Sequence, residues 1–193
     1  MNKTRRKSLA MPDIMSANIS FVTQAGENKI QFTNNILSEQ EIAKHEKYMR
    51  EAIEEAKKSA KYPFCAVIVN RNSGEILSRG VNSWVKNPIL HGEIQAINHY
   101  VTLYGNQGWN NVALYTTAEP CSMCMSALVW TGIREVIWAT SISGLRNMGI
   151  HQIDISAQEI AERASSFYSP ISLVGGILAN ETDKLFSERR KKN

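Results

Sequence analysis

Two cysteines three positions apart follow a proline in the sequence Pro-Cys-Ser-Met-Cys, residues 120–124. A pair with this spacing can form a disulfide, act as a redox pair, belong to a structural zinc site, or supply ligands to a catalytic metal. The chain has 193 residues, of which 43% are hydrophobic and only three are cysteines. A chain of this length builds its own core, and a low, odd number of cysteines is typical of reduced, intracellular thiols. We therefore expect Cys121 and Cys124 to be free thiols.

A shared metal ion requires a further ligand, because the sequence has no second Cys-x-x-Cys motif. Among the four histidines, only His91 lies at the start of a predicted helix with a carboxylate close by, in the sequence His91-Gly92-Glu93. His-x-Glu followed about thirty residues later by Pro-Cys-x-x-Cys is the signature of zinc deaminases. The remaining candidates are interpreted as surface or packing residues, namely His45, His99, His151 and the strand residue Cys65.

The spacing of these residues favours one shared zinc ion. Cys121 and Cys124 occupy positions i and i+3 of a predicted helix, and its positive end favours the thiolate form. With Gly92 between them at a helix start, His91 and Glu93 can both face one cavity. Three ligands, His91, Cys121 and Cys124, leave the fourth tetrahedral position open to water, as in catalytic zinc sites.

The chemistry predicted from this set is hydrolytic deamination. Zinc lowers the pKa of a water in the open position toward roughly 7, so that hydroxide can attack an amidine carbon. Glu93 would take the proton of the water, pass it to the ring nitrogen and then protonate the leaving amine. Two alternatives stay open, a redox pair of the two cysteines and a structural zinc site with Glu93 as the fourth ligand.

Alternating helices and strands must position these residues. Ser38 and Glu41 form a predicted capping box at the start of a helix of about five turns. Further helices are expected from residue 91 to Gly105 and at 121–130, 156–164 and 180–190, and strands at 64–69, 75–78, 112–115, 136–139 and 171–174. An initial hairpin followed by alternating elements predicts an α/β fold with three layers, α/β/α, around a mixed and largely parallel sheet.

The ends of the chain differ from its middle. Residues 1–36 lack sustained periodicity and are predicted to form a poorly ordered lead-in, and residues 37–193 are predicted to form one zinc-dependent deaminase domain. No apolar run approaches the roughly 18 residues of a membrane span, and the polar residues after the basic N-terminus argue against a signal peptide. We therefore expect a cytoplasmic protein with no membrane partner.

The positive charge is concentrated at the two ends. The net charge is +4, but four basic residues precede Ser8, and four basic residues and one acidic residue follow Ser187, which leaves −3 for residues 8–187. Basic tails can bind an RNA backbone, although such charge runs are more often solvated ends. A tRNA partner is therefore possible in charge terms, but the body of the chain does not favour it.

Several segments resemble the cytidine deaminase-like superfamily, in particular the branch of guanine deaminases, tRNA adenosine deaminases and fungal-type cytosine deaminases. The similarity covers about residues 48–190, and the segments that carry it are 63–67, 80–82, 87–93, 119–124 and 176–181. The resemblance implies a five-stranded sheet between helices and a dimer. It also implies that Asn82 hydrogen-bonds the base and that Phe64 forms part of its wall, the alternatives being a turn asparagine and a core phenylalanine.

The expected substrate is a free nucleobase or nucleoside, with a purine such as guanine first. Phe64 after Pro63 resembles nucleobase deaminases, whereas the basic C-terminal helix resembles tRNA adenosine deaminases, which makes inosine formation in a tRNA anticodon the second hypothesis. A non-enzymatic zinc module is the third. The apolar helix containing Met123 and Trp130 favours a homodimer.

Overall fold

A five-stranded sheet in the order β2-β1-β3-β4-β5 forms the centre of this computed structural model, which describes residues 37–59 and 61–189. The strands are β1 (Cys65–Asn70), β2 (Ile76–Val81), β3 (Val112–Ala118), β4 (Glu135–Thr140) and β5 (Ser172–Val174). β1 is antiparallel to both β2 and β3, whereas β3 with β4 and β4 with β5 are parallel.

The prediction of a mixed five-stranded sheet is confirmed: β2, β3, β4 and β5 run in the same direction, and β1 is reversed. The β1–β2 hairpin reverses the chain, and the next helix then carries it past β1 to β3. β3 consequently runs parallel to β2 and antiparallel to β1, which lies between them. Half of the strand pairings are therefore antiparallel.

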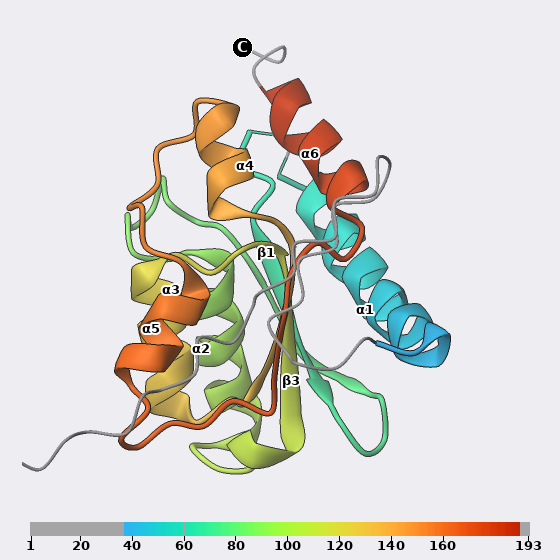
Figure 1. The fold of residues 1–193 in the computed structure, drawn as a ribbon, viewed down its shortest axis with the longest axis vertical. Helices are drawn as coiled ribbons and strands as arrows, with labels where there is room; N and C mark the ends of the chain where they lie inside the picture. Colours follow the sequence, from blue (N-terminus) through green and yellow to red (C-terminus); the bar gives the residue numbers. More distant parts are fainter. Residues whose placement is uncertain (1–36, 60, 190–193) are drawn as a thin grey trace, which may run out of the picture.

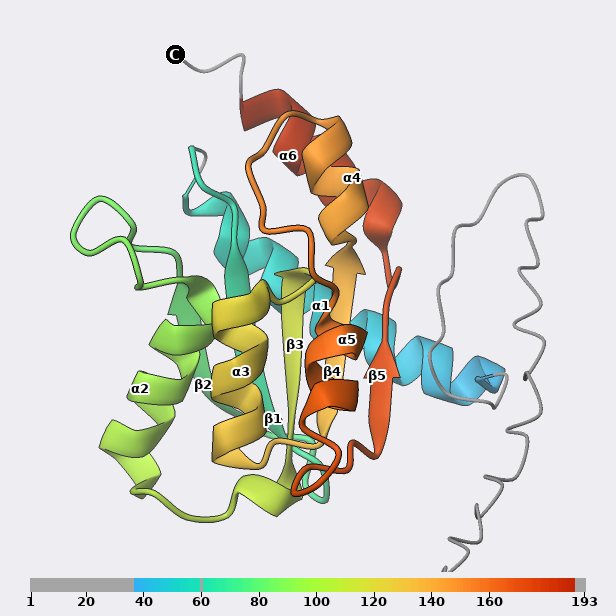
Figure 2. The same cartoon turned by 60° about the vertical axis from the view of Figure 1, so that its left-hand side comes forward.

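Helices cover both faces of the sheet, as the three-layer prediction requires (Figures 1 and 2). α2 (Gly92–Tyr104), α3 (Ser122–Thr131) and α5 (Ala157–Arg163) lie on one face, and α1 (Glu39–Lys57) and α6 (Ala179–Glu188) lie on the other. A 3-10 turn, Trp109–Asn111, precedes β3. Each face has its own apolar cluster, one around Trp138 and Leu114 and the other around Met49 and Tyr115.

The helix boundaries bear out most of the sequence signals. Ser38 and Glu41 form the predicted capping box of α1, and Gly105, at φ 75°, ends α2. His91 and Cys121 are the N-cap residues of α2 and α3. Cys121 was predicted to lie in the first turn of α3, but it lies one residue before that turn.

Two features differ from the sequence analysis. α4 (Ile142–Asn147) was not predicted, because six residues are too few to show a helical period. The apolar helix predicted at 121–130 was expected to be buried, but Trp130 of α3 is 79% exposed. The lead-in predicted for residues 1–36 lies outside the described residues. In the described ranges, no helix combines the length and apolarity needed to cross a membrane.

Candidate metal and catalytic site

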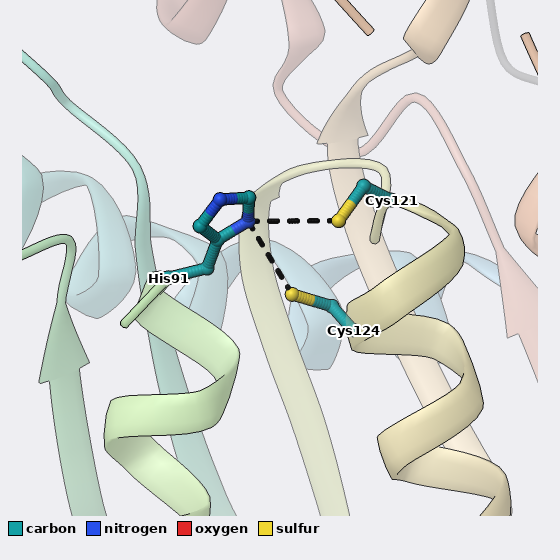
Figure 3. A group of neighbouring side chains, drawn as sticks. All are labelled: His91, Cys121 and Cys124. Carbon is teal, nitrogen blue, oxygen red and sulfur yellow. Dashed lines mark hydrogen bonds between the residues drawn. The ribbon is translucent and has the colours of Figure 1, made fainter. Parts of the chain in front are cut away.

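The fold brings together three potential metal ligands from two helix starts (Figure 3). His91 lies at the N-cap of α2, and Cys121 and Cys124 lie at the N-cap and in the first turn of α3. The Nδ1 atom of His91 is 3.5 Å from the Sγ atom of Cys121 and 3.6 Å from that of Cys124. All three ligand atoms lie within 4.8 Å of one another, so they can reach a single ion.

These distances fit a tetrahedral zinc ion. With Zn–N and Zn–S bonds of about 2.0 and 2.3 Å, a tetrahedral angle places nitrogen and sulfur about 3.5 Å apart. The measured separations of 3.5 and 3.6 Å agree with that value. One imidazole and two thiols also form a donor set that suits zinc. The residues therefore fit the ion, with one coordination position left for a small molecule.

The side chains prepare one another for metal binding. The hydrogen bond with Cys124 and, after it, the one with His91 together lower the pKa of Cys121 to about 4, against the opposing effect of burial. The hydrogen bond that His91 forms with Cys121 raises the pKa of His91. The pKa of Cys124 is raised, because this residue supplies the proton shared between the sulfurs and is buried. Zinc binding would release that proton, which makes metal affinity dependent on pH.

Glu93 lies in the first turn of α2, two residues after His91, and only 6% of it is exposed. Thr116, on β3, donates a hydrogen bond of 3.0 Å to its carboxylate. Burial raises the pKa of Glu93, and the nearby Cys121 thiolate raises it further. A carboxyl group with a raised pKa beside a metal site can both accept and donate a proton near neutral pH.

Two glycines allow α2 to begin close to the sheet. A Cβ atom on Gly92 would lie 2.9 Å from the Cα atom of Cys65 on β1, and one on Gly80 would lie 2.2 Å from the backbone oxygen of Gly92. Both separations are below van der Waals contact, so larger side chains would push the helix away. Gly80 and Gly92 thereby set the depth at which His91 and Glu93 sit against the strands.

Asn82 follows the last residue of β2, and Phe64 precedes the first residue of β1, so both lie at the same end of these strands. The Asn82 N–H donates a 2.9 Å hydrogen bond to the Phe64 carbonyl. The Asn82 side-chain oxygen accepts a 2.8 Å bond from the N–H of Trp84, which is the contact of a turn asparagine. Phe64 is half-buried, and its ring centroid lies 4.7 Å from that of Phe186 on α6. The hydroxyl of Thr117, near the end of β3, accepts a hydrogen bond from the Cys65 N–H. This bond holds the start of β1 beside the loop that leads to the two metal-ligand cysteines.

The other candidate residues do not belong to the group of three ligands in the described part of the chain. His45 is buried and hydrogen-bonds Tyr115, while His99 and His151 are exposed. Cys65 is a buried, free thiol in β1. Sequence reasoning missed Thr116, and no signal in the sequence could have found it, because its contact with Glu93 joins residues 23 positions apart.

The comparison with known families agrees with this geometry. Residues 42–140 match the family described as the cytidine and deoxycytidylate deaminase zinc-binding region. The chain belongs to this family. It is thus a zinc-dependent hydrolytic deaminase, with a histidine and two cysteines positioned to bind the metal.

Relatives of this deaminase differ in their substrates. It is 30% identical over 153 residues to a probable cytosine deaminase of Schizosaccharomyces pombe, an alignment that covers 75% of this chain and 89% of that protein. It is 33% identical over 128 residues to a tRNA-specific adenosine deaminase of Rickettsia felis, covering 65% and 84% of the two chains.

A guanine deaminase from Nitrosomonas europaea has a similar structure, with a TM-score of 0.65, 19% identity, and coverage of 84% of this chain and 98% of that one. At that identity, the likeness shows the fold alone. The fold and the deaminase chemistry are therefore shared across these relatives, and their substrates are not.

Proposed function

We propose that this deaminase hydrolyses the exocyclic amine of a free nucleobase or nucleoside, with a purine such as guanine first, and releases ammonia. The observation that carries the proposal is the buried carboxylate of Glu93 beside the cluster of His91, Cys121 and Cys124. A proton carrier next to an open metal position is what hydrolysis of a cyclic amidine requires.

In this proposal, His91, Cys121 and Cys124 hold the zinc ion, which when bound acts as a Lewis acid and makes water a better nucleophile. Glu93 accepts one proton from the attacking water and delivers it to the ring nitrogen. It then transfers the second proton of the water to the amine, which leaves as ammonia. Thr116 keeps the carboxylate oriented for both transfers through its 3.0 Å hydrogen bond.

Asn82 and Phe64 are proposed to bind the base. Because the Asn82 oxygen already accepts the Trp84 N–H, its amide nitrogen is the group it can offer to an acceptor on the base edge. Phe64 would contact the flat face of the base, and Phe186 supports it from behind. A ring-edge donor and a flat apolar wall suit a purine that carries carbonyl or ring-nitrogen acceptors.

A tRNA substrate is the second candidate, and one surface feature favours it. Trp84 follows Asn82 by two residues, is 50% exposed, and has its ring centroid 5.7 Å from that of Tyr62. Lys61 lies 5.8 Å from the Tyr62 ring. Exposed aromatic rings with a nearby cation can stack on flanking nucleotides of a single strand. Against this stands the net charge of −3 in residues 8–187.

The deciding experiment measures ammonia release from free bases and nucleosides by the full chain and by a chain lacking residues 1–7 and 190–193. The C-terminal cut spares Arg189, which is the C-cap of α6. We expect turnover of a free purine, unchanged by the cuts and weakly dependent on salt. With a tRNA substrate, the logarithm of the affinity would instead fall with the logarithm of the salt concentration by about 0.7 per phosphate contact, and removing the tails would reduce this slope. Inosine formation in a tRNA anticodon, lost with the tails and without activity on any free base or nucleoside, would contradict the proposal.

We also propose that the deaminase is a cytoplasmic homodimer. α3 is rich in apolar residues, and the ring centroid of its exposed Trp130 lies 5.2 Å from that of the exposed Phe167. Two large apolar side chains side by side on the surface are typical of a buried contact in an assembly. Light scattering should give twice the chain mass of 21.7 kDa, and a mass of one chain at micromolar concentration would contradict the dimer.

A further inference from the structure

We propose that Glu119 is a positioning residue that fixes the zinc side and the base side of the active site relative to each other. The inference rests on the proposed ligands Cys121 and Cys124 and on the proposed base wall at Phe64. It adds a residue that neither holds the metal nor touches the base.

Glu119 is a buried carboxylate in the short segment between β3 and α3, two residues before Cys121. Its Oε2 atom accepts a 2.9 Å hydrogen bond from the N–H of Ile142, and its Oε1 atom accepts a 2.9 Å bond from the N–H of Ala157. Its own N–H donates a 2.7 Å bond to the carbonyl of Thr140 at the end of β4. Glu119 thereby connects the segment before α3 with the starts of α4 and α5.

The two N–H groups belong to the first residues of α4 and α5, where a helix leaves its N–H groups without internal partners. Ser141 and Ser156 cap these helices by accepting the N–H groups of Gly144 and Glu159. The serines do not serve the first N–H of either helix, and Glu119 accepts both. The starts of α4 and α5 are therefore held at a common point beside the cysteine segment.

The hydrogen bond between Glu119 and the start of α5 connects Glu119 with the metal ligands. Ala157 and Ala161 of α5 lie in the same buried cluster as Leu128 and Val129 of α3. Cys121 is the N-cap residue of α3, and Cys124 lies in its first turn. The bond from Ala157 to Glu119 therefore sets α5 against the helix that presents both thiols.

The hydrogen bond between Glu119 and the start of α4 connects Glu119 with the proposed base wall at Phe64. Leu145 of α4 and Ile150 just after it form a cluster with Phe186, against which Phe64 packs. A shift of the α4 start would move Leu145 and, through this cluster, the ring of Phe64. The bond from Ile142 to Glu119 therefore ties the base wall to the segment that contains Cys121.

Only a carboxylate can perform this role at Glu119, because both of its oxygens are acceptors. A glutamine of the same shape has one oxygen and one NH2 group, so one of the two N–H groups would face another donor. Glu119→Gln consequently removes one anchor while it changes the volume little.

The matched control is Glu135, a second buried glutamate at the opposite end of the sheet. Its carboxylate is held by side-chain cations, with Arg71 Nε at 2.6 Å and Lys44 Nζ at 3.8 Å. Glu135→Gln therefore disturbs a buried carboxylate of equal size with no connection to the helices of the site.

The first experiment compares Glu119→Gln with Glu135→Gln in the full chain. Zinc affinity is measured by competition with a chelator, KM with the base that the parent deaminates, and stability by thermal unfolding. We expect Glu119→Gln to weaken zinc binding about tenfold or more, the scale of residues that orient metal ligands, and to raise KM. Glu135→Gln should lower stability and leave zinc affinity and KM unchanged. Parental zinc affinity and KM in a folded Glu119→Gln protein would overturn the proposal.

A second experiment removes the donors one at a time and decides the case if Glu119→Gln does not fold. Proline is tolerated at the first position of a helix, and the preceding Ser141 and Ser156, at ψ 161° and 156°, already have the extended conformation that proline requires. We expect Ala157→Pro to weaken zinc binding chiefly and Ile142→Pro to raise KM chiefly.

Equal effects of both prolines on zinc affinity and KM would overturn the proposal, and so would changes in stability alone. The zinc measurement needs no substrate, so it tests Glu119 even if the protein deaminates no free purine. Failure of the substrate proposal and failure of this one are thereby separated.

Discussion

Glu93 and Glu135 are two buried glutamates at opposite ends of one sheet, each only 6% exposed, and their surroundings differ in charge. Glu135 forms ion pairs with Arg71 and Lys44, whereas Glu93 receives a hydrogen bond from Thr116 and lies near the Cys121 thiolate. Glu135 has two cations as ion-pair partners, an arrangement that supports the fold. At Glu93, burial and the nearby thiolate raise the pKa of the carboxyl group, which favours proton exchange near neutral pH. The comparison therefore contrasts an ion-paired glutamate with the one proposed to carry protons.

Replacing Glu93 should have the largest effect on activity. We expect Glu93→Gln to reduce the deamination rate by at least about 10²–10⁴-fold, the usual contribution of general acid–base catalysis. Stability should change little, because glutamine has nearly the same shape and its side-chain oxygen can still accept the hydrogen bond from Thr116. Steady-state kinetics and thermal unfolding of the same preparation measure both quantities.

Zinc content provides the control for this substitution. Glu93→Gln should retain about one zinc ion per chain, whereas Cys124→Ser should lose zinc and activity together. Loss of zinc in Glu93→Gln would identify Glu93 as a metal ligand. That result would favour the structural zinc site over the enzyme site.

Replacing Glu135 should have the converse effect. Glu135→Gln weakens the pairs with Arg71 and Lys44, and we expect it to lower the free energy of unfolding by about 1–3 kcal/mol. The rate of deamination should stay at the parental value, because Glu135 begins β4 at the end of the sheet away from the site. Chemical denaturation and kinetics at the same pH give the two values, and a large loss of rate without loss of stability would break the comparison.

The smallest effect is expected at His45, which lies near Glu135 and hydrogen-bonds Tyr115 at 3.1 Å. Burial lowers the pKa of His45, so the unfolded chain binds its proton first as the pH falls. The stability that neutral His45 contributes is therefore present above its ordinary pKa of about 6.5 and is lost as the pH falls toward the lower folded value.

Unfolding at pH 7.5 and 5.5 should show this loss in the parent and not in His45→Gln, with a difference of at most about 1.4 kcal/mol per pH unit. The pH dependence of the deamination rate should be the same in both proteins. An equal pH dependence of stability in parent and variant would show that His45 does not titrate as proposed.

The candidate metal ligands, the candidate proton carrier and most of the helices and strands could be predicted from the sequence. His91, Glu93, Cys121 and Cys124 were identified from residue type and spacing, because metal ligands and helix starts leave local signals. The capping box at Ser38 and the glycine stop of α2 are equally local. Strands and helices with a clear period were found within a few residues of their true bounds.

The contacts between these parts could not be predicted from the sequence, because they depend on the folded arrangement of the whole chain. The antiparallel β1–β3 pairing, the bond from Thr116 to Glu93 and the two bonds to Glu119 join residues 23 or more positions apart. Such contacts depend on the order of strands and on where helix ends converge, which no short window of sequence contains. The same buried side chain, glutamate, has a threonine donor and a thiolate beside it at residue 93, cations at 135 and two backbone N–H donors at 119, because the fold surrounds each with different partners.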